Sequence, residues 1–577
     1  MTYNLRPKIK IKHTAQTWTS YEEISEELNR QLKEGKRTIA LECYPGVHLS
    51  ELEQHLLNTL TDVRLIKADD YAYDAATLTK KIAANLTEDR VFGVMSHAVL
   101  EDFYPEYEVA QMQKEFAEES KNIVVYGTGA TILLPDPDIL CYADLTRWEI
   151  QKRHRAGMPN WKAANEEEDN LKKVKRGFFF EWRVADRLKQ KLTERIDYLL
   201  DTNVPNQVKM VDGASYRTAL DQIVEQPFRL VPYFDASVWG GQWMKKEFNL
   251  NPEQENYGWA FDGVLEENSV CLDFAGTTIE IPAINVVHER PIALLGKKVQ
   301  ARFGNEFPIR FDYLDTVGGG NLSLQVHPRV DYIQEKFGMT YTQNESYYIL
   351  QAAENATIYL GVKEGTEKED LFAALRKAEK GDYRFPDEKY INCFPVKKHD
   401  HYSIPAGTIH CGGPETVVLE ISQTPYIFTF KLWDWERLGL DGVPRPVHLA
   451  HGEENVDMSY DTAWVQENLI NPFETLHDTR DYRIEKTGLH ELEFIETHRH
   501  WFKEEAVLSV HQSVNMLNLV EGETITVESV DGRFDPFEIH YGETFIVPEA
   551  IKEYRLVNQG EPTKEVAVIQ AFVRNLS

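Results

Sequence analysis

A polar amide and an imidazole lie two residues apart in the segment NLSLQVHPRVDY, residues 321–332. This segment reads as a β-strand that ends at a proline, and alternate side chains of a strand lie on the same face. Gln325 and His327 therefore share one face, while Leu324 and Val326 lie on the other. A wetted surface would explain two polar side chains there, and so would a ligand that both of them hold.

Two further segments supply side chains of the same kind. In TQNESYYIL, Glu345 opens a predicted strand, so its carboxylate lies at a strand end. In YSIPAGTIHCGG, a Pro-Ala-Gly turn precedes His410, and glycine permits the tight approach that aims the imidazole inward. Two histidines, one glutamate and a neutral oxygen donor form a reasonable ligand set for Zn²⁺ or a similar divalent ion. Each residue alone is weak evidence, but the three segments together favour a metal site.

The elements that position these residues change character near residue 228. From about residue 20 to 225, helical and strand-like segments alternate, which is typical of an α/β domain. After residue 228, short aromatic or β-branched runs are separated by Gly, Pro and Asn, as in sandwiches and jelly rolls. One helical interruption is expected at residues 366–382.

We therefore expect a multidomain protein. Residues 1–225 would form an α/β domain. Residues 226–485 would form an all-β jelly-roll domain that carries the metal and a helical insertion. Residues 486–577 would form a second, smaller β-domain without metal, because Lys552 stands where its turn should present a histidine.

The N-terminal half contains a sequence with the order of a phosphate-binding loop but not its chemistry. TIALECYPGVHLSELEQHLLNTL runs strand, turn, helix, yet Glu42 and His48 replace the glycines and Leu49 replaces the lysine. The segment resembles a degenerate uridine-kinase-type P-loop domain, and a plain α/β domain with a tight turn at Pro45 and Gly46 explains it equally. Neither reading predicts an active kinase, and a role in assembly or regulation fits both. The charged stretch 152–177 reads as an exposed helical excursion or lid.

Composition narrows the class of partner. The 577 residues include 63 Lys and Arg against 93 Asp and Glu, a net charge of −30, which disfavours nucleic acid and anionic membranes. A small-molecule partner is favoured, and an anionic one would need local basic groups. The five cysteines are scattered, which predicts reduced, mostly buried thiols. The sequence shows no apolar leader and no run of about 18 apolar residues, so we expect a soluble, cytoplasmic protein.

Several motifs in order resemble one enzyme family. They are SVWGGQW, FPIRFDYLD…LSLQVHP, NESYYIL, IPAGTIH…VVLEISQ and LWDWERLGLDGVPRPVHL. Over residues 230–577 the chain resembles the type I mannose-6-phosphate isomerases in their short bacterial form, which are zinc enzymes of the cupin class. The resemblance implies Gln325, His327, Glu345 and His410 as ligands of one zinc ion per chain. It also implies Arg437 as the catalytic arginine.

Two departures from the family concern the substrate. The family has lysines where this chain has Asp312 and Gln343. Those lysines would help to hold a sugar phosphate. Their absence leaves phosphate recognition to groups such as Arg437, Arg445 or Lys431, or removes it.

The resemblance implies an aldose–ketose isomerase that interconverts mannose 6-phosphate and fructose 6-phosphate or a related sugar. A proton would move between C1 and C2 through a cis-enediolate, whose charge a metal and a guanidinium would stabilise. Glu420 is a candidate general base, or more simply a partner that orients a ligand. Two alternatives remain: a non-catalytic sugar sensor, and an iron-dependent cupin oxygenase, against which the Gln-x-His spacing argues.

Overall fold

The computed structural model describes residues 3–574, apart from residues 382, 424–426, 441, 443 and 491–492. The chain divides into two compact units. Unit 1 comprises residues 1–7, 224–268 and 290–577, and unit 2 comprises residues 8–223 and 269–289. Residues 269–289, which the sequence placed with the C-terminal half, thus pack within unit 2.

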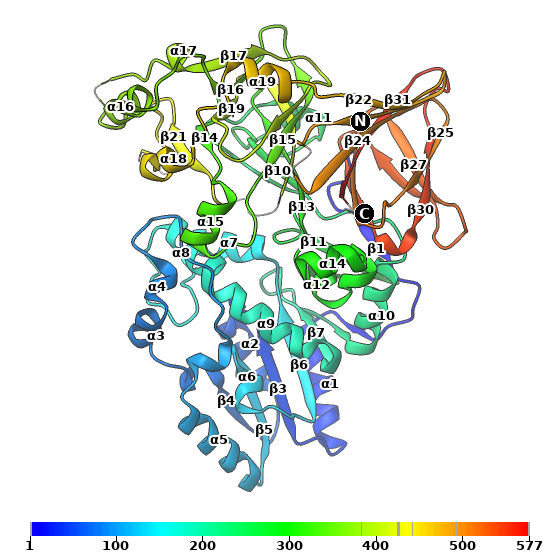
Figure 1. Ribbon diagram of the computed structural model, residues 1–577. Helices are drawn as coiled ribbons and strands as arrows, with labels where there is room; N and C mark the ends of the chain where they lie inside the picture. The colour runs from blue at the N-terminus through cyan, green and yellow to red at the C-terminus, as the bar shows by residue number, and fades with distance from the viewer. Residues whose placement is uncertain are drawn as a thin grey trace. The chain divides into compact units, whose positions relative to one another are not determined.

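Unit 2 is built on a seven-stranded sheet in the order β2-β8-β7-β6-β3-β5-β4 (Figure 1). The strands are β2 (Thr17–Trp18), β3 (Thr38–Cys43), β4 (Val63–Lys67), β5 (Asn122–Gly127), β6 (Ile139–Asp144), β7 (Tyr198–Asp201) and β8 (Lys209–Asp212). The strands from β7 to β4 run parallel. Central strand β3 is buried from Ile39 onward, as expected for a parallel strand covered on both faces.

Helices alternate with these strands, which confirms the α/β pattern expected for this half. The longer ones are α1 (Tyr21–Lys33), α2 (Leu49–His55), α3 (Ala75–Lys81), α5 (Glu106–Glu118), α7 (Arg147–Arg155), α8 (Asn170–Arg176), α9 (Trp182–Leu192) and α10 (Gly213–Ile223). Ser20 caps the start of helix α1, because its side chain accepts a hydrogen bond from the Glu23 amide. The expected strand, turn and helix around residues 38–55 are present as β3 and α2. No helix among the described residues is both long and apolar enough to cross a membrane.

The charged stretch 152–177 is exposed in part, as at residues 166–168, but several of its charged side chains are buried, which the expectation of an exposed lid did not include. Arg153, Lys173 and Arg176 are at most 5% exposed. Each has an acceptor in the protein: Arg153 pairs with Glu149 at 3.0 Å, and Arg176 pairs with Glu181 at 3.1 Å. Lys173 donates to backbone carbonyls. Burial of charge is tolerated here because these groups are paired or hydrogen-bonded.

A three-stranded sheet completes unit 2. It contains β1 (Lys8–Lys10), β11 (Ser269–Phe274) and β12 (Thr277–Pro282). Strand β1 pairs in parallel with β11, which pairs antiparallel with β12. This pairing ties the start of the chain to residues 269–289 within the same unit.

The first part of unit 1 contains two antiparallel sheets. One has the order β18-β15-β20-β13-β10-β9 and the other β17-β16-β19-β14-β21. Their strands are β9 (Tyr233–Asp235), β10 (Trp259–Gly263), β13 (Ile309–Asp315), β14 (Leu324–Val326), β15 (Glu345–Ala352), β16 (Thr357–Val362), β17 (Ile391–Pro395), β18 (His401–Ile404), β19 (His410–Gly412), β20 (Thr416–Gln423) and β21 (Phe430–Trp433). Helix α16 (Lys368–Glu379) confirms the predicted helical interruption.

A second pair of antiparallel sheets follows in the same unit. The orders are β22-β23-β24-β31-β26-β29 and β25-β30-β27-β28. The strands are β22 (Glu474–Asp478), β23 (Tyr482–Thr487), β24 (Ile495–Phe502), β25 (Glu505–Ser509), β26 (Asn515–Glu521), β27 (Thr524–Ser529), β28 (Phe537–His540), β29 (Thr544–Val547), β30 (Glu553–Asn558) and β31 (Val566–Val573). One apolar core draws on both sheets, with Leu517 and Val568 from the first and Val527 and Leu556 from the second. The two sheets therefore pack as a sandwich.

The cysteines are free thiols. Cys43, Cys141, Cys271 and Cys411 are buried, and Cys393 is exposed. Burial raises the pKa of Cys43 and of Cys411 well above the usual value. The expectation of scattered, mostly buried thiols is confirmed.

Candidate metal centre

The three segments selected from the sequence meet in unit 1. Gln325 lies in the middle of β14, and His327 follows this strand directly. Glu345 is the first residue of β15, and His410 is the first residue of β19. In the antiparallel pair β14–β19, Gln325 lies directly opposite His410. Strand pairing thus places side chains 85 residues apart next to each other.

The Pro-Ala-Gly turn before β19 is fixed to the end of β14. Gly407 has φ 93°, a left-handed conformation that strongly favours glycine. Its amide donates to the His327 carbonyl over 3.0 Å. The turn that delivers His410 is therefore held against the residue that carries the other imidazole.

Both imidazoles face the carboxylate of Glu345. Nε2 of His410 lies 2.6 Å from Oε1 of Glu345, and Nε2 of His327 lies 3.2 Å from Oε2. One potential ligand atom from each of the three residues lies within 4.8 Å of the others. All three side chains are buried. Among the described residues, His327, Glu345 and His410 form the group of potential ligands that could hold a metal ion.

The second nitrogen of each ring fixes which atom is available to a metal. Nδ1 of His327 lies 3.2 Å from the Phe428 carbonyl, and Nδ1 of His410 lies 2.9 Å from the Thr408 carbonyl. A carbonyl only accepts, so Nδ1 carries the hydrogen and Nε2 presents a lone pair. This backbone orientation of a ligating histidine is usual in metal sites.

The residues present fit a divalent ion. Two lone pairs and a carboxylate directed at one another in a buried space repel unless a cation or protons lie between them. Nε2 of His327 and Oε1 of Glu345 are buried and have no hydrogen-bond partner among the described residues. Burial raises the pKa of Glu345, and positive charge at His327 and His410 lowers it; a cation between the three groups would act in the same direction and favour the carboxylate form.

Gln325 completes the set with a neutral donor. Its amide nitrogen lies 3.2 Å from Nε2 of His410. The nitrogen and oxygen of a side-chain amide exchange places by a half-turn, so the oxygen can occupy the same position. Glu, His, His and an amide oxygen form a mixed N/O set that suits zinc and other first-row divalent metals.

Gln343 connects Glu345 to a second buried carboxyl group. Its amide nitrogen donates to Oε2 of Glu345 over 3.0 Å and to Oε1 of Glu420 over 3.1 Å. Burial, reinforced by Asp312 and Glu345, raises the pKa of Glu420 well above its usual value. Gln343 therefore orients the carboxylate that faces the histidines.

Asp312 lies in the same layer and has a partner that the sequence did not reveal. It is directly opposite Glu420 in the β13–β20 pair, and Arg310 pairs with it at 2.6 Å. Burial raises the pKa of Asp312 to about 6, with Arg310 opposing and Glu345 adding to the shift. Arg310 could have been recognised from its position two residues before Asp312 on the same strand face.

Arg437 is held by Asp434 and by the segment that leads into β14. Its guanidinium donates to Oδ1 of Asp434 over 2.8 Å and to the Asn321 carbonyl over 2.6 Å. Asp434 also accepts from Ser323, two residues before Gln325, and from Arg445. Among the described residues, no hydrogen bond or ion pair joins Arg437 to Glu345 or the two histidines. Arg437 is thus a neighbour of the strand that carries two candidate ligands.

Lys431 lies closer to the centre in the strand register. In the β14–β21 pair it is directly opposite Gln325. Side chains directly opposite one another on paired strands lie on the same face. The ammonium group therefore belongs to the same layer of the sheet as the Gln325 amide.

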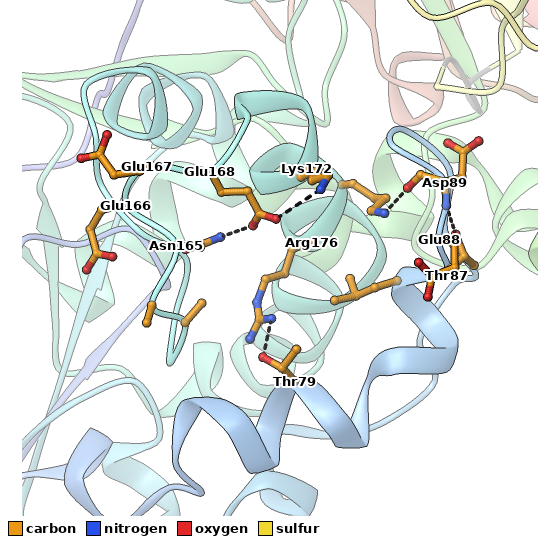
Figure 2. Close-up of a pocket in the computed structure, with 14 residues that line it drawn as sticks. Thr79, Thr87, Glu88, Asp89, Asn165, Glu166, Glu167, Glu168, Lys172 and Arg176 are labelled. Atoms are coloured by element: carbon orange, nitrogen blue, oxygen red, sulfur yellow. Dashed lines mark hydrogen bonds and ion pairs between the residues drawn. The ribbon is translucent and has the colours of Figure 1, made fainter.

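A separate cavity of about 560 Å³ lies in unit 2, lined by α3, α8 and residues 163–168 (Figure 2). Its cations have protein partners. Arg176 donates to Thr79 over 3.1 Å, Lys175 donates to the Asp89 carbonyl, and Lys172 lies 3.8 Å from Glu168. The positive charges of this cavity are therefore already paired or hydrogen-bonded within its wall.

Comparison with known proteins relates the chain to one group of enzymes. Mannose-6-phosphate isomerase ManA of Bacillus subtilis is 23% identical over 340 residues, 58% of this chain and 97% of that protein. Mannose-6-phosphate isomerase of Streptococcus mutans is 27% identical over 237 residues, 40% of this chain and 67% of that protein. A crystal structure of mannose 6-phosphate isomerase from Bacillus subtilis is 20% identical, with a TM-score of 0.49, and covers 60% of this chain and 99% of that one.

Residues 20–225 match a family described as a domain of unknown function, DUF8485. The remainder of the chain provides a buried, histidine-and-carboxylate site between antiparallel strands that could bind a metal. The chain is similar to mannose-6-phosphate isomerases, which confirms the resemblance read from its motifs. The resemblance of residues 20–225 to a P-loop domain stays a prediction.

Proposed function

We propose that this chain is a metal-dependent aldose–ketose isomerase that interconverts mannose 6-phosphate and fructose 6-phosphate or a related sugar. One observation carries the proposal. The Nε2 lone pairs of His327 and His410 converge on the buried carboxylate of Glu345, in a chain that resembles mannose-6-phosphate isomerases. Gln325, His327, Glu345 and His410 would hold one ion per chain, with zinc as the expected metal.

The proposed reaction moves a proton between C1 and C2 of an open-chain sugar. When bound, a divalent metal supplies Lewis-acid stabilisation of the negative charge that grows on the sugar oxygens. Gln343 and Glu420 keep the Glu345 carboxylate aimed at the histidines. Glu420, whose pKa is raised by burial, is kept as a candidate proton carrier.

Arg437 is the proposed catalytic arginine, and its surroundings support a role toward a negatively charged substrate. Asp434 holds Arg437 and Arg445 together, so two guanidinium groups share one carboxylate. Both arginines are partly exposed, with 20% and 24% of the side chain accessible. Lys431 adds a further cation opposite Gln325. These groups would take over phosphate recognition from the lysines that Asp312 and Gln343 replace.

A free sugar is the second candidate substrate. Asp312 and Glu420 lie opposite each other near Glu345, so this side of the site is acidic. Carboxyl groups repel a phosphate dianion but accept hydrogen bonds from sugar hydroxyls. The relative rates on phosphorylated and free mannose show whether the cations around Asp434 or the carboxyl groups of Asp312 and Glu420 determine the substrate.

The domain organisation is proposed on the same basis. The two antiparallel sheets that meet at Glu345 support a cupin jelly roll over residues 226–485. The sandwich that follows supports a second, cupin-like β-domain over residues 486–577. Residues 1–225 would form an α/β domain whose role is assembly or regulation.

A coupled assay with mannose 6-phosphate and with free mannose tests the proposal. The metal-loaded chain is expected to form ketose, His410→Ala is expected to lose at least 100-fold in rate, and Arg437→Ala at least tenfold. The exposed His13 provides a matched control, and His13→Ala should keep full activity. Activity that survives both site substitutions would contradict the assignment, and inactivity of metal-loaded protein on all sugars would favour a sensor.

A further inference from the structure

Unit 1 contains a cavity of its own, which lies far from the candidate metal centre. It has a volume of about 830 Å³, within the range of small-molecule sites. Gln351 of β15 lines it, and Glu345 at the other end of β15 faces the histidines. Six residues of strand separate these positions by roughly 20 Å. A ligand in this cavity would not touch the metal ligands.

The wall of this cavity combines aromatic rings with amides. Trp243 of α11 (Trp243–Glu247) and Tyr541 form one side, with ring centroids 6.3 Å apart and planes at 74°. The Gln351 amide donates to the Tyr541 hydroxyl over 3.2 Å, and Asn558, whose amide donates to the Lys503 and Lys564 carbonyls, also lines the cavity. Aromatic faces with a few placed polar groups are typical of ligand sites.

A network of charged side chains fixes one rim. Glu521 lies 2.5 Å from the Lys398 ammonium and 3.1 Å from Nε2 of His399. Nδ1 of His399 lies 2.7 Å from the Tyr348 hydroxyl. Hydrogen bonds from His399 and Lys398 lower the pKa of Glu521 to about 2, although burial opposes the shift, so the group is a carboxylate.

The same rim contains a strained backbone position. His399 has φ 72°, a left-handed conformation that is uncommon outside glycine, although histidine adopts it more often than most residues. Its carbonyl accepts a hydrogen bond from Arg499 over 2.7 Å, and its ring is held between Tyr348 and Glu521. These contacts hold His399 in this conformation next to Glu521, which lines the cavity.

The charge of the cavity selects the ligand class. Five glutamates and two lysines line it: Glu247, Glu521, Glu523, Glu561, Glu565, Lys398 and Lys564. Both lysines are paired within the cavity wall, Lys398 with Glu521 and Lys564 with Glu561 at 3.3 Å. The remaining field is negative and repels a phosphate or carboxylate ligand. Carboxylates accept hydrogen bonds from hydroxyl groups, and amides both donate to them and accept from them. This combination favours a ligand with hydroxyl groups over a cation, which cannot accept a hydrogen bond from an amide.

We propose that this cavity, lined by Trp243, Gln351, Glu521 and Tyr541, binds an uncharged monosaccharide at a site distinct from the metal centre. The aromatic side packs against the apolar face of the sugar ring. The amides and carboxylates take up its hydroxyl groups. The proposal does not depend on isomerase activity.

Ligand-detected NMR on the full chain tests it, with mannose, glucose, galactose and fructose as probes. The His410→Ala chain is used so that turnover at the metal centre does not contribute, and only binding that the cavity substitutions weaken is assigned to the cavity. At least one free sugar should show saturation transfer, and mannose 6-phosphate should bind at least tenfold more weakly. Trp243→Ala and Gln351→Leu should each weaken sugar binding at least tenfold, while Tyr107→Ala, an exposed aromatic in unit 2, should not.

Circular dichroism and melting temperature of each variant establish that it is folded. Gln351→Leu keeps the side-chain volume, so it separates loss of the amide from loss of packing. The proposal is overturned if none of the four sugars binds to the His410→Ala chain. It is also overturned if binding is unaffected by both cavity substitutions, or if spermidine binds there and the sugars do not.

Discussion

Nε2 of His410 lies 2.6 Å from Oε1 of Glu345, although 65 residues of chain separate them. The contact exists because β15 begins at Glu345 and the turn at Gly407 brings His410 to the start of β19. His327 approaches the other oxygen of the same carboxylate. This carboxylate therefore organises the candidate site.

Removal of one imidazole should remove the metal. His410→Ala is expected to bind zinc at least 100-fold more weakly than the unaltered chain, because it leaves two strong ligands and one amide. Competition with a chromophoric chelator measures the affinity, and elemental analysis measures the stoichiometry, which should be one ion per chain. His13→Ala, which alters an exposed histidine, should bind zinc normally. Equal affinity in both variants would place the metal elsewhere.

Gln343→Leu should affect both the metal and the fold. It removes two hydrogen bonds to buried carboxyl groups, which should cost about 1–3 kcal/mol of folding free energy. Loss of an outer-shell partner should also weaken metal affinity about 10–100-fold. Gln334→Leu, on the exposed face of α15 (Val330–Phe337), is the control and should change neither quantity. Unchanged metal affinity in Gln343→Leu would show that Gln343 does not orient Glu345.

The folding stability of unit 2 should depend on a buried ion pair. Lys189 lies 2.9 Å from both oxygens of Asp144 and 3.0 Å from the Asn285 side-chain oxygen. Lys189→Ala leaves Asp144 buried without its cation and should destabilise unit 2 by about 3–5 kcal/mol. Lys191→Ala removes an exposed pair with Glu101 and should cost less than about 1 kcal/mol. Calorimetry of both variants measures the difference, and equal melting temperatures would contradict the expectation.

The C-terminal sandwich should lose stability in mild acid. Burial lowers the pKa of His500 to about 3, and both of its ring nitrogens are hydrogen-bonded, to Tyr482 and Gln570. Below pH 6.5 the unfolded chain binds a proton that the folded chain does not. The contribution is thus complete above pH 6.5 and is lost at about 1.4 kcal/mol per pH unit as the pH falls toward 3.

His500→Gln isolates this contribution. Melting temperatures at pH 7.5 and pH 5.0 should differ less in the variant than in the unaltered chain. His13→Gln, at an exposed position, should retain the full difference. An identical pH dependence in His500→Gln would mean that His500 is protonated in the folded protein.

The metal cluster could be predicted because its signals are local. Strand alternation places Gln325 and His327 together, and the glycine at position 407 marks the turn before His410. The pairing of the buried carboxyl groups of Asp312 and Glu420 could not be predicted in this way. Asp312 and Glu420 become neighbours through the β13–β20 register, which joins residues 108 positions apart and is not visible in either segment alone.

The burial of several charged side chains within residues 152–177 was not predicted, for the same reason. The charges in this stretch suggest solvent, but their partners come from elsewhere in the chain. Arg153 donates to the Gly46 carbonyl, and Lys175 donates to the Asp89 carbonyl. A single segment shows its charges but not the distant acceptors that allow them to be buried.

Reactivation of the metal-free chain tests the central claim most directly. The protein is stripped with a chelator, zinc is added back in steps, and formation of fructose 6-phosphate or fructose from the corresponding mannose substrate is followed by NMR. Activity should be absent without metal and should rise to a plateau at one ion per chain, and His410→Ala should stay inactive throughout. Full turnover in the stripped protein, or a metal-loaded chain that forms no ketose from either sugar, would contradict the account.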